Sequence, residues 1–143
     1  MANGILVPVV DFTGMAEDEF NDWYDLEHIP ERLRVPGFLA SERWLGADNQ
    51  KISVATYELD NAGVLRSPAY DAVGNHAQGG ANLSVWSKRV TARIKMLMRF
   101  EGEQIAIDHR DLQRAIIRIL KELAWMLRAL VPIHAPRQYP EIA

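Results

Sequence analysis

Short runs of β-branched and aromatic residues predict four strands in the chain. The first run, Ile5 to Phe12, is almost wholly apolar and is followed by Thr13-Gly14, a pattern typical of a largely buried strand. Pro8 inside this run favours an edge position or a bulge, because proline has no N–H to donate to a neighbouring strand.

The next two strands flank the polar segment GADNQK. Phe38 to Leu45 alternates in polarity, and Ile52 to Leu59 is again dense in β-branched and aromatic residues. The polar segment predicts a hairpin turn, so these two strands should pair antiparallel. One face of the earlier strand is expected to carry Phe38, Ala40, Glu42 and Trp44.

The fourth strand is predicted within Lys88 to Gln104, after a weakly helical stretch, Asn61 to Val73, and a loop, GNHAQGGANLS. The order strand, helix, strand, strand, helix, strand predicts an α+β fold. The predicted fold is a ferredoxin-like βαββαβ subunit, in which both helices cover one face of a four-stranded antiparallel sheet. Alternation in the fourth strand places one set on one face, Ile94, Met96, Met98 and Phe100, and another set on the opposite face, Arg93, Lys95, Arg99 and Glu101.

A long final helix is predicted from Asp108, a suitable N-cap, to Val131, with Pro132 ending it. We therefore divide the chain into a domain, residues 1–107, and a helical extension, residues 108–143, that packs on the domain or on a second subunit. Basic residues interrupt the helix, so it is not a membrane span. Its apolar stripe consists of Leu112, Ile116, Ile119, Leu123, Met126 and Leu130.

The segment Phe20 to Gly37, FNDWYDLEHIPERLRVPG, carries the most chemically suggestive pattern. On a helix, Tyr24 and His28 are one turn apart and share a face. Pro30 disfavours helical geometry at the residue before it, so the first helix is expected to end there and a second to begin. His28 then lies at a helix C-terminus, where the dipole and nearby carboxylates favour the imidazolium. This predicts a histidine that changes charge near neutral pH, or one that only caps the helix.

Composition excludes several classes of protein. The chain has 143 residues, 48% of them hydrophobic, which suits one compact domain with its own core. It has no cysteine, which excludes disulfides, thiolate catalysis and cysteine-ligated metals. A net charge of −3 gives nucleic acid no general attraction, and no leader or membrane segment is indicated. We expect a cytoplasmic protein that binds neither nucleic acid nor membrane.

The segment FNDWYDLEHIPERLRVPGF, the later LRSPAY and the WSKRV before the last strand resemble small EthD-like proteins of the dimeric α/β-barrel superfamily. The resemblance covers roughly residues 4–106. It implies a ferredoxin-like subunit that forms a homodimer sheet to sheet, with a pocket between each sheet and its helices. It also implies that His28 is the acid/base residue, although the superfamily includes isomerases, cyclases, lyases, cofactor-free monooxygenases and haem-degrading enzymes. The long helix after Asp108 departs from the compact pattern of the group.

His28 and Tyr24 form a candidate acid/base pair for proton abstraction beside a carbonyl or for elimination of water. Arg32, one turn further along if the helix continues, is a candidate for holding a substrate carboxylate, or else forms an exposed ion pair with Asp25 or Glu31. His76, in the glycine-rich loop, is a second candidate acid/base group. Aromatic residues that line a cavity, or simply fill the core, are Trp44, Tyr57, Tyr70 and Trp86.

The four histidines are isolated in the sequence, which gives no metal-binding spacing, and no dinucleotide or phosphate-loop motif occurs. We therefore predict a small cofactor-independent lyase, isomerase or cyclase that acts on an apolar or aromatic carbonyl compound. The alternatives are a non-catalytic small-molecule binding or accessory protein, a cofactor-free monooxygenase, or a haem protein with one axial histidine.

Overall fold

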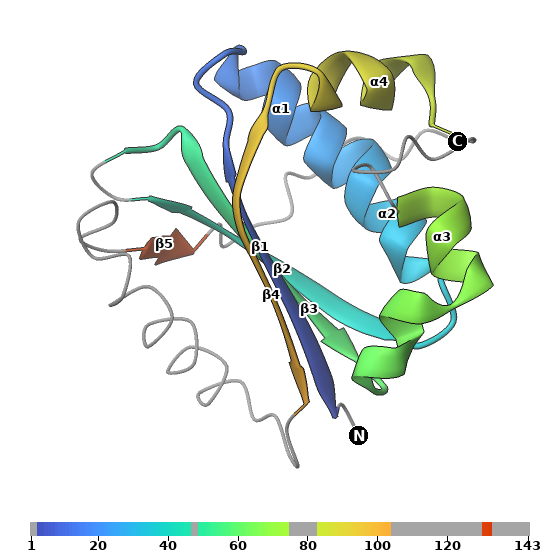
Figure 1. Cartoon of the computed structure of the whole chain (residues 1–143). Helices are drawn as coiled ribbons and strands as arrows, with labels where there is room; N and C mark the ends of the chain where they lie inside the picture. The colour runs from blue at the N-terminus through green and yellow to red at the C-terminus, as the bar shows by residue number, and fades with distance from the viewer. Residues whose placement is uncertain (1–2, 47–48, 75–82, 104–129, 133–143) are drawn as a thin grey trace, which may run out of the picture.

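The computed structural model of the chain describes residues 3–46, 49–74, 83–103 and 130–132. Its centre is an antiparallel sheet in the order β4-β1-β3-β2-β5, with the helices gathered on one face (Figure 1). The βαββαβ order and the four-stranded antiparallel sheet predicted from the sequence are confirmed, and a short fifth strand extends the sheet. The strands are Gly4–Asp11 (β1), Phe38–Gly46 (β2), Ile52–Leu59 (β3), Lys95–Glu103 (β4) and Leu130–Pro132 (β5).

The helical layer begins with α1, Glu17–Trp23, which continues as a π-helical turn, Tyr24–His28 (η1), and then as α2, Ile29–Leu33. Between β3 and β4 lie three short helices: the 3₁₀ helix Ala62–Arg66 (η2), Pro68–Gly74 (α3) and Val85–Thr91 (α4).

Helix α4 corrects the predicted start of the last strand. Residues from Lys88 to Thr91 are helical, and the strand begins at Lys95. Ser84 caps α4, its Oγ accepting a hydrogen bond from the Ser87 N–H at 2.9 Å. Ser84, the residue directly before this helix, was the local signal for it in the sequence, because serine is a favoured N-cap residue.

Pro8 does not make β1 an edge strand, because β1 lies between β3 and β4. The pairing of β1 with β3 instead omits Val7 and Pro8, and the pairing with β4 contains a bulge between Val9 and Val10. The alternative expectation, a bulge within this strand, is wrong as well, because the extra residue of the irregularity lies in β4.

Bulges also overturn two predicted sets of face-sharing residues. In β4 the extra residue is Leu97, so Met96 pairs with Val10 on the helix-covered face, while Met98 pairs with Val9 on the other. Strict alternation fails across such a bulge because two residues of one strand oppose one residue of its neighbour.

In β2 the extra residue is Leu39. Phe38 consequently faces the helices, where its ring contacts Tyr57 at 5.6 Å between centroids. Trp44, expected on the same face as Phe38, pairs with Val54 and packs on the opposite face of the sheet.

The apolar core has two parts. The larger lies between sheet and helices, and Phe12, Phe20, Leu59 and Val90 are among its fully buried members. On the other face Ile5, Val7 and Val9 are no more than 1% exposed in the single chain. A homodimer would be expected if this apolar face were exposed in the single chain. At the centre of the sheet the face is already buried, so its exposure is no argument for a partner subunit there.

The predicted final helix is wrong at its end. Leu130–Pro132 forms β5, which pairs antiparallel with Trp44–Gly46 of β2, so the chain supplies a partner for part of an otherwise open strand edge. The rest of the predicted helix, residues 108–129, and the residues after Pro132 lie outside the described part of the chain.

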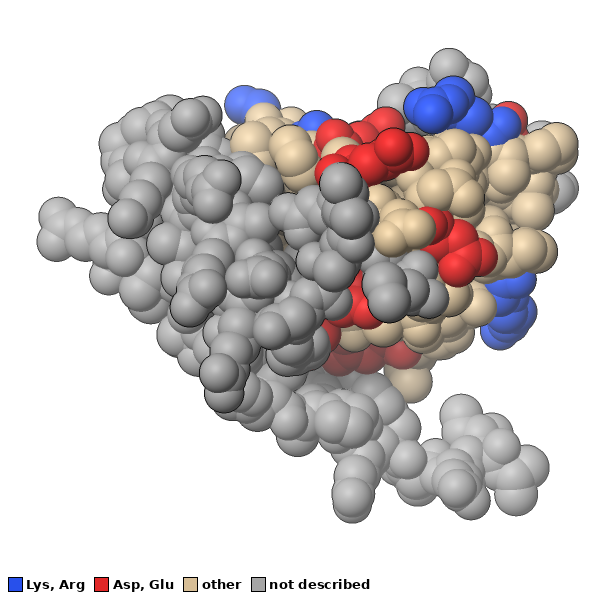
Figure 2. All heavy atoms as spheres, turned by 90° about the horizontal axis from the view of Figure 1, so that it is seen from below, with Lys and Arg blue, Asp and Glu red and all other residues tan. Residues whose placement is uncertain are grey.

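On the described surface seen in Figure 2, acidic side chains lie towards the middle and basic ones towards the margins.

Gly37 sets the turn between α2 and β2. Its φ of 96° is in the left-handed region, and its carbonyl accepts a hydrogen bond from the Asp60 N–H at 2.9 Å. A Cβ at this position would lie 2.4 Å from Cγ2 of Val64. The turn thus needs a residue without a side chain for both conformational and steric reasons.

We predict that Gly37→Ala lowers the free energy of unfolding by about 1–3 kcal/mol. Urea denaturation of both proteins provides the measurement. Gly63→Ala is the matched control, because Gly63 is exposed, has no positive φ, and its added Cβ would meet the Asn61 side chain, which can move. Equal losses in the two variants would contradict the assigned role of Gly37.

Candidate functional site

A cavity of about 270 Å³ lies between the sheet and the helical layer. The sheet contributes apolar walls from Leu6, Pro8 and Val10 of β1, together with Met96 of β4. The helical layer contributes polar and aromatic side chains, which the sequence of the first helical segment brings together. This is the size and character of a site for a small organic molecule.

The helix that carries these residues does not end before Pro30, as expected, but continues to Leu33 with helical dihedral angles at His28 and Ile29. The Ile29 N–H donates to the Tyr24 carbonyl, five residues earlier, which is a π-helical hydrogen bond. A wider turn accommodates a proline that has no N–H to donate and whose ring would crowd the carbonyl four residues before it. His28 is therefore inside a continuous helix, and the argument from a helix C-terminus does not apply to it.

The prediction that Tyr24 and His28 share a face is confirmed. Their ring centroids are 4.7 Å apart, and the His28 ring also lies 4.5 Å from that of Trp23. His28 is 8% exposed, and all three side chains line the cavity. The imidazole is held between two aromatic rings and is accessible from the cavity.

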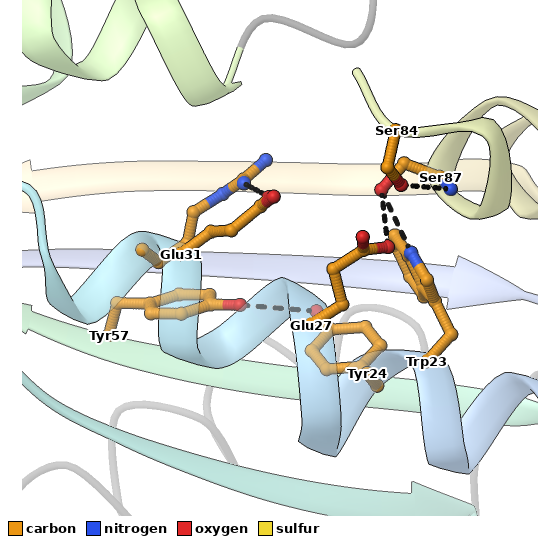
Figure 3. A network of polar contacts seen from close by, with 8 residues as sticks. Trp23, Tyr24, Glu27, Glu31, Tyr57, Ser84 and Ser87 are labelled. Carbon is orange, nitrogen blue, oxygen red and sulfur yellow. Dashed lines mark hydrogen bonds and ion pairs between the residues drawn. The ribbon is translucent and has the colours of Figure 1, made fainter. Parts of the chain in front are cut away.

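Trp23 is fixed by a hydrogen-bond chain that links the central helix to α4 (Figure 3). Its Nε1 donates to Ser87 Oγ at 3.0 Å, and that hydroxyl donates to Glu27 Oε2 at 3.1 Å. Ser87 is fully buried. The chain gives Trp23 one orientation and so fixes one of the two rings against which His28 packs.

Tyr24 faces Tyr57 of β3 across the cavity, and the two hydroxyls meet (Figure 3). Tyr57 OH donates to Tyr24 OH over 3.5 Å, a long hydrogen bond that leaves room for a ligand oxygen to compete for both groups. Burial raises the pKa of Tyr24, and burial raises the pKa of Tyr57 well above its ordinary range. Both phenols are therefore neutral hydrogen-bond donors at physiological pH.

The guanidinium of Arg43, on β2, packs against the ring of Tyr24. Its Cζ lies 4.5 Å from the Tyr24 ring centroid, Nη1 donates to Asp25 Oδ1, and Nη2 donates to Asn21 Oδ1, both at 2.7 Å. Arg43 is 5% exposed, so its charge is held almost out of water by these contacts. Asp25 is thus the partner of Arg43 and not of Arg32.

Two further arginines line the cavity itself. Arg32 projects from α2, is 3% exposed, and lies 3.5 Å from Glu31. Arg99 projects from β4, donates through Nε to Glu101 at 2.8 Å, and has its guanidinium 5.7 Å from the Tyr70 ring centroid. Arg32 therefore reaches the cavity, as one alternative expected, and is not a solvent-exposed ion pair.

The structure brings together five of the predicted site residues, which all line the cavity: Tyr24, His28, Arg32, Tyr57 and Tyr70. Trp44 lies on the opposite face of the sheet and is not among the residues that line this cavity. Trp86 packs partly buried against the larger core cluster and is not among the lining residues. His76 lies outside the described residues.

Sequence reasoning missed Arg99, Arg43 and Ser87. Arg99 was assigned to the face opposite Met96 because strict alternation was assumed. The three consecutive apolar residues Met96, Leu97 and Met98 were the signal of a bulge. Arg43, a charged residue in the middle of a half-buried strand, could have been recognised as a buried cation needing acceptors.

Within the described ranges, no group of three histidine, aspartate or glutamate side chains is arranged to hold a metal ion. None of the described helices is long and apolar enough to cross a membrane.

The chain matches no protein-family profile, and no curated protein is significantly similar to it. The fold is compatible with the ferredoxin-like arrangement that the resemblance to EthD-like proteins implied.

We predict that Arg43→Met lowers the free energy of unfolding by about 2–4 kcal/mol, because it leaves Asn21 buried without this donor and Asp25 without its counter-charge. Thermal and urea unfolding provide the measurement. Arg89→Met is the control, since Arg89 makes an equally short ion pair with Glu19 but is 52% exposed, and should cost no more than about 1 kcal/mol. Similar losses for the two variants would show that Arg43 is not a structural support of the site.

Proposed function

We propose that the protein is a small cofactor-independent enzyme, a lyase, isomerase or cyclase, that transfers a proton on an apolar or aromatic carbonyl compound with His28 as acid and base. One observation carries the proposal: His28 lines the same small cavity as two buried, neutral phenols, Tyr24 and Tyr57. A base and a pair of oxyanion donors are the two components that proton abstraction beside a carbonyl requires.

In the proposed reaction the substrate carbonyl oxygen lies between the hydroxyls of Tyr24 and Tyr57. His28 removes a proton from the carbon next to the carbonyl, and the electron pair of the broken C–H bond forms a C=C bond while the oxygen gains negative charge. The phenols donate hydrogen bonds to this oxyanion. They stabilise it without ionising, because burial has raised the pKa of both.

The imidazolium then returns the proton. Delivery to another carbon restores the carbonyl and gives an isomer, and delivery to a departing hydroxyl gives water and an unsaturated product. Both outcomes are redox-neutral, so the proposed chemistry requires no electron carrier. The apolar part of the cavity wall lowers the local polarity, which strengthens the hydrogen bonds to the developing charge.

His28 depends on its neighbours for this role. Trp23, held by Ser87, and Tyr24, held by Arg43, keep the imidazole in one place. Preorganisation of this kind lowers the reorganisation needed when charge develops in the transition state.

The resemblance to EthD-like proteins supports the proposal further, and with it a homodimer of the dimeric α/β-barrel type. Phe100 of β4, on the sheet face away from the helices, is 38% exposed at the edge of the sheet, where a second copy would cover it. We predict a dimer in sedimentation velocity at micromolar protein concentration. Sedimentation as a monomer at that concentration would remove this part of the proposal.

The enzymatic part is tested by exchange of substrate protons. We predict that the protein accelerates exchange of α-protons for deuterium in small aromatic ketones dissolved in D₂O, followed by proton NMR. His28→Gln should slow this exchange by about 10²–10⁴-fold, and Tyr24→Phe should slow it less, because one of two donors remains. The rise in rate across roughly pH 5 to 8, the range of a histidine, should disappear in His28→Gln.

Asp18→Asn is the surface control and should exchange like the wild type, since Asp18 is exposed in the first turn of α1. Circular dichroism establishes that each variant is folded. Equal rates for the wild type and a folded His28→Gln would exclude His28 as the base. Exchange no faster than in buffer for every ketone would favour a non-catalytic binding protein.

A further inference from the structure

The charges around the cavity indicate what its ligand carries. Among the described residues that line it, the ionised side chains are the guanidiniums of Arg32 and Arg99, and none is a carboxylate. Arg32 comes from the helical layer and Arg99 from the sheet, so positive charge faces the cavity from both of its layers. We propose that the ligand is a small aromatic or alicyclic carboxylate, and that Arg99 is the residue that selects for its negative charge.

Arg99 is suited to this role by the donors that it offers. Its hydrogen bond to Glu101 uses Nε, one of the five N–H donors of a guanidinium, and the Tyr70 ring lies over the planar group at 5.7 Å. A planar fork fixed in this way matches a carboxylate, which accepts two parallel hydrogen bonds. The side chains of Arg99 and Glu101 are 34% and 39% exposed, so solvent partly screens the charges of both and the ion pair remains open to exchange of partners.

Arg32 adds positive charge in a less hydrated position. It is 3% exposed, and its neighbour Glu31 is only partly buried and does not line the cavity. Arg32 therefore adds to the positive charge that a ligand meets on the helical side of the cavity.

The register of the sheet sets the size of the ligand. Tyr57 of β3 pairs with Leu6 of β1, while Arg99 of β4 pairs with Pro8 of β1, so Tyr57 and Arg99 are two strands apart. Two strand spacings amount to roughly 10 Å between backbones. A molecule with its carbonyl at the phenols and its carboxylate at Arg99 therefore has an apolar body of one or two rings between them. The apolar residues Leu6, Val10, Ile94 and Met96 line the path of that body.

This inference rests on the proposed function in using the same cavity and in placing the carbonyl of the ligand at the phenols, and binding measurements test it separately. The probes are naphthalene-2-carboxylate and its neutral carboxamide, titrated by calorimetry into the full chain. We expect the wild type to bind the carboxylate at least about tenfold more tightly than the carboxamide, the size of effect that a charge-assisted bidentate contact produces.

Arg99→Gln should reduce this preference to less than about threefold and leave carboxamide binding unchanged, and Arg99→Lys should keep part of it. Arg93→Gln is the matched control, because Arg93 is exposed, lies near the start of β4 and does not line the cavity. Equal binding of the two probes by the wild type, no binding of either, or an undiminished preference in folded Arg99→Gln would overturn the inference.

His28→Gln separates this inference from the proposed enzyme activity. It should keep the preference for the carboxylate over the carboxamide while losing proton exchange. A carboxylate preference without any catalysed exchange would leave the inference standing and remove the proposed function. Catalysed exchange without the preference would do the reverse.

Discussion

The site depends on one backbone constraint, the passage of a helix through Pro30. A proline in a helix interior leaves one hydrogen bond unmade and crowds the preceding turn. Here the turn from Tyr24 to His28 widens, and the Ile29 N–H reaches back five residues to the Tyr24 carbonyl. The helix therefore continues, and three consecutive turns present Tyr24, His28 and Arg32 to one cavity. If the helix had ended at Pro30, the chain would turn there and Arg32 would not lie one helical turn beyond His28.

Two buried polar contacts then hold the rings that surround His28. Ser87 ties Trp23 to α4, and Arg43 ties Tyr24 to β2, so the imidazole is supported from both the helical layer and the sheet. Both contacts join residues far apart in the sequence, 64 positions for Trp23 and Ser87 and 18 for Asp25 and Arg43. The arrangement of the site is consequently a property of the whole fold and not of the helix alone.

Local features were predictable from the sequence, and long-range ones were not. The contact between Tyr24 and His28 follows from their spacing on a helix, and the order of strands follows from runs of β-branched residues. The position of Trp44 was predicted wrongly because one extra residue, Leu39, exchanges the faces of a strand. Arg99 was assigned to the face opposite Met96 for the same reason. A bulge depends on pairing with another strand, which periodicity within one strand does not reveal.

The bulge at Leu97 also decides which charge the cavity carries. Met96 and Arg99 are three positions apart yet face the same side, which regular alternation forbids and one inserted residue allows. Without Leu97 the strand would alternate regularly, with Met96 and Arg99 on the cavity side and Met98 on the far side. If Leu97 instead paired as an ordinary strand residue, every residue after it would change faces and Arg99 would leave the cavity. The charge of the cavity therefore depends on how β4 pairs with β1 as well as on which amino acids form the cavity wall.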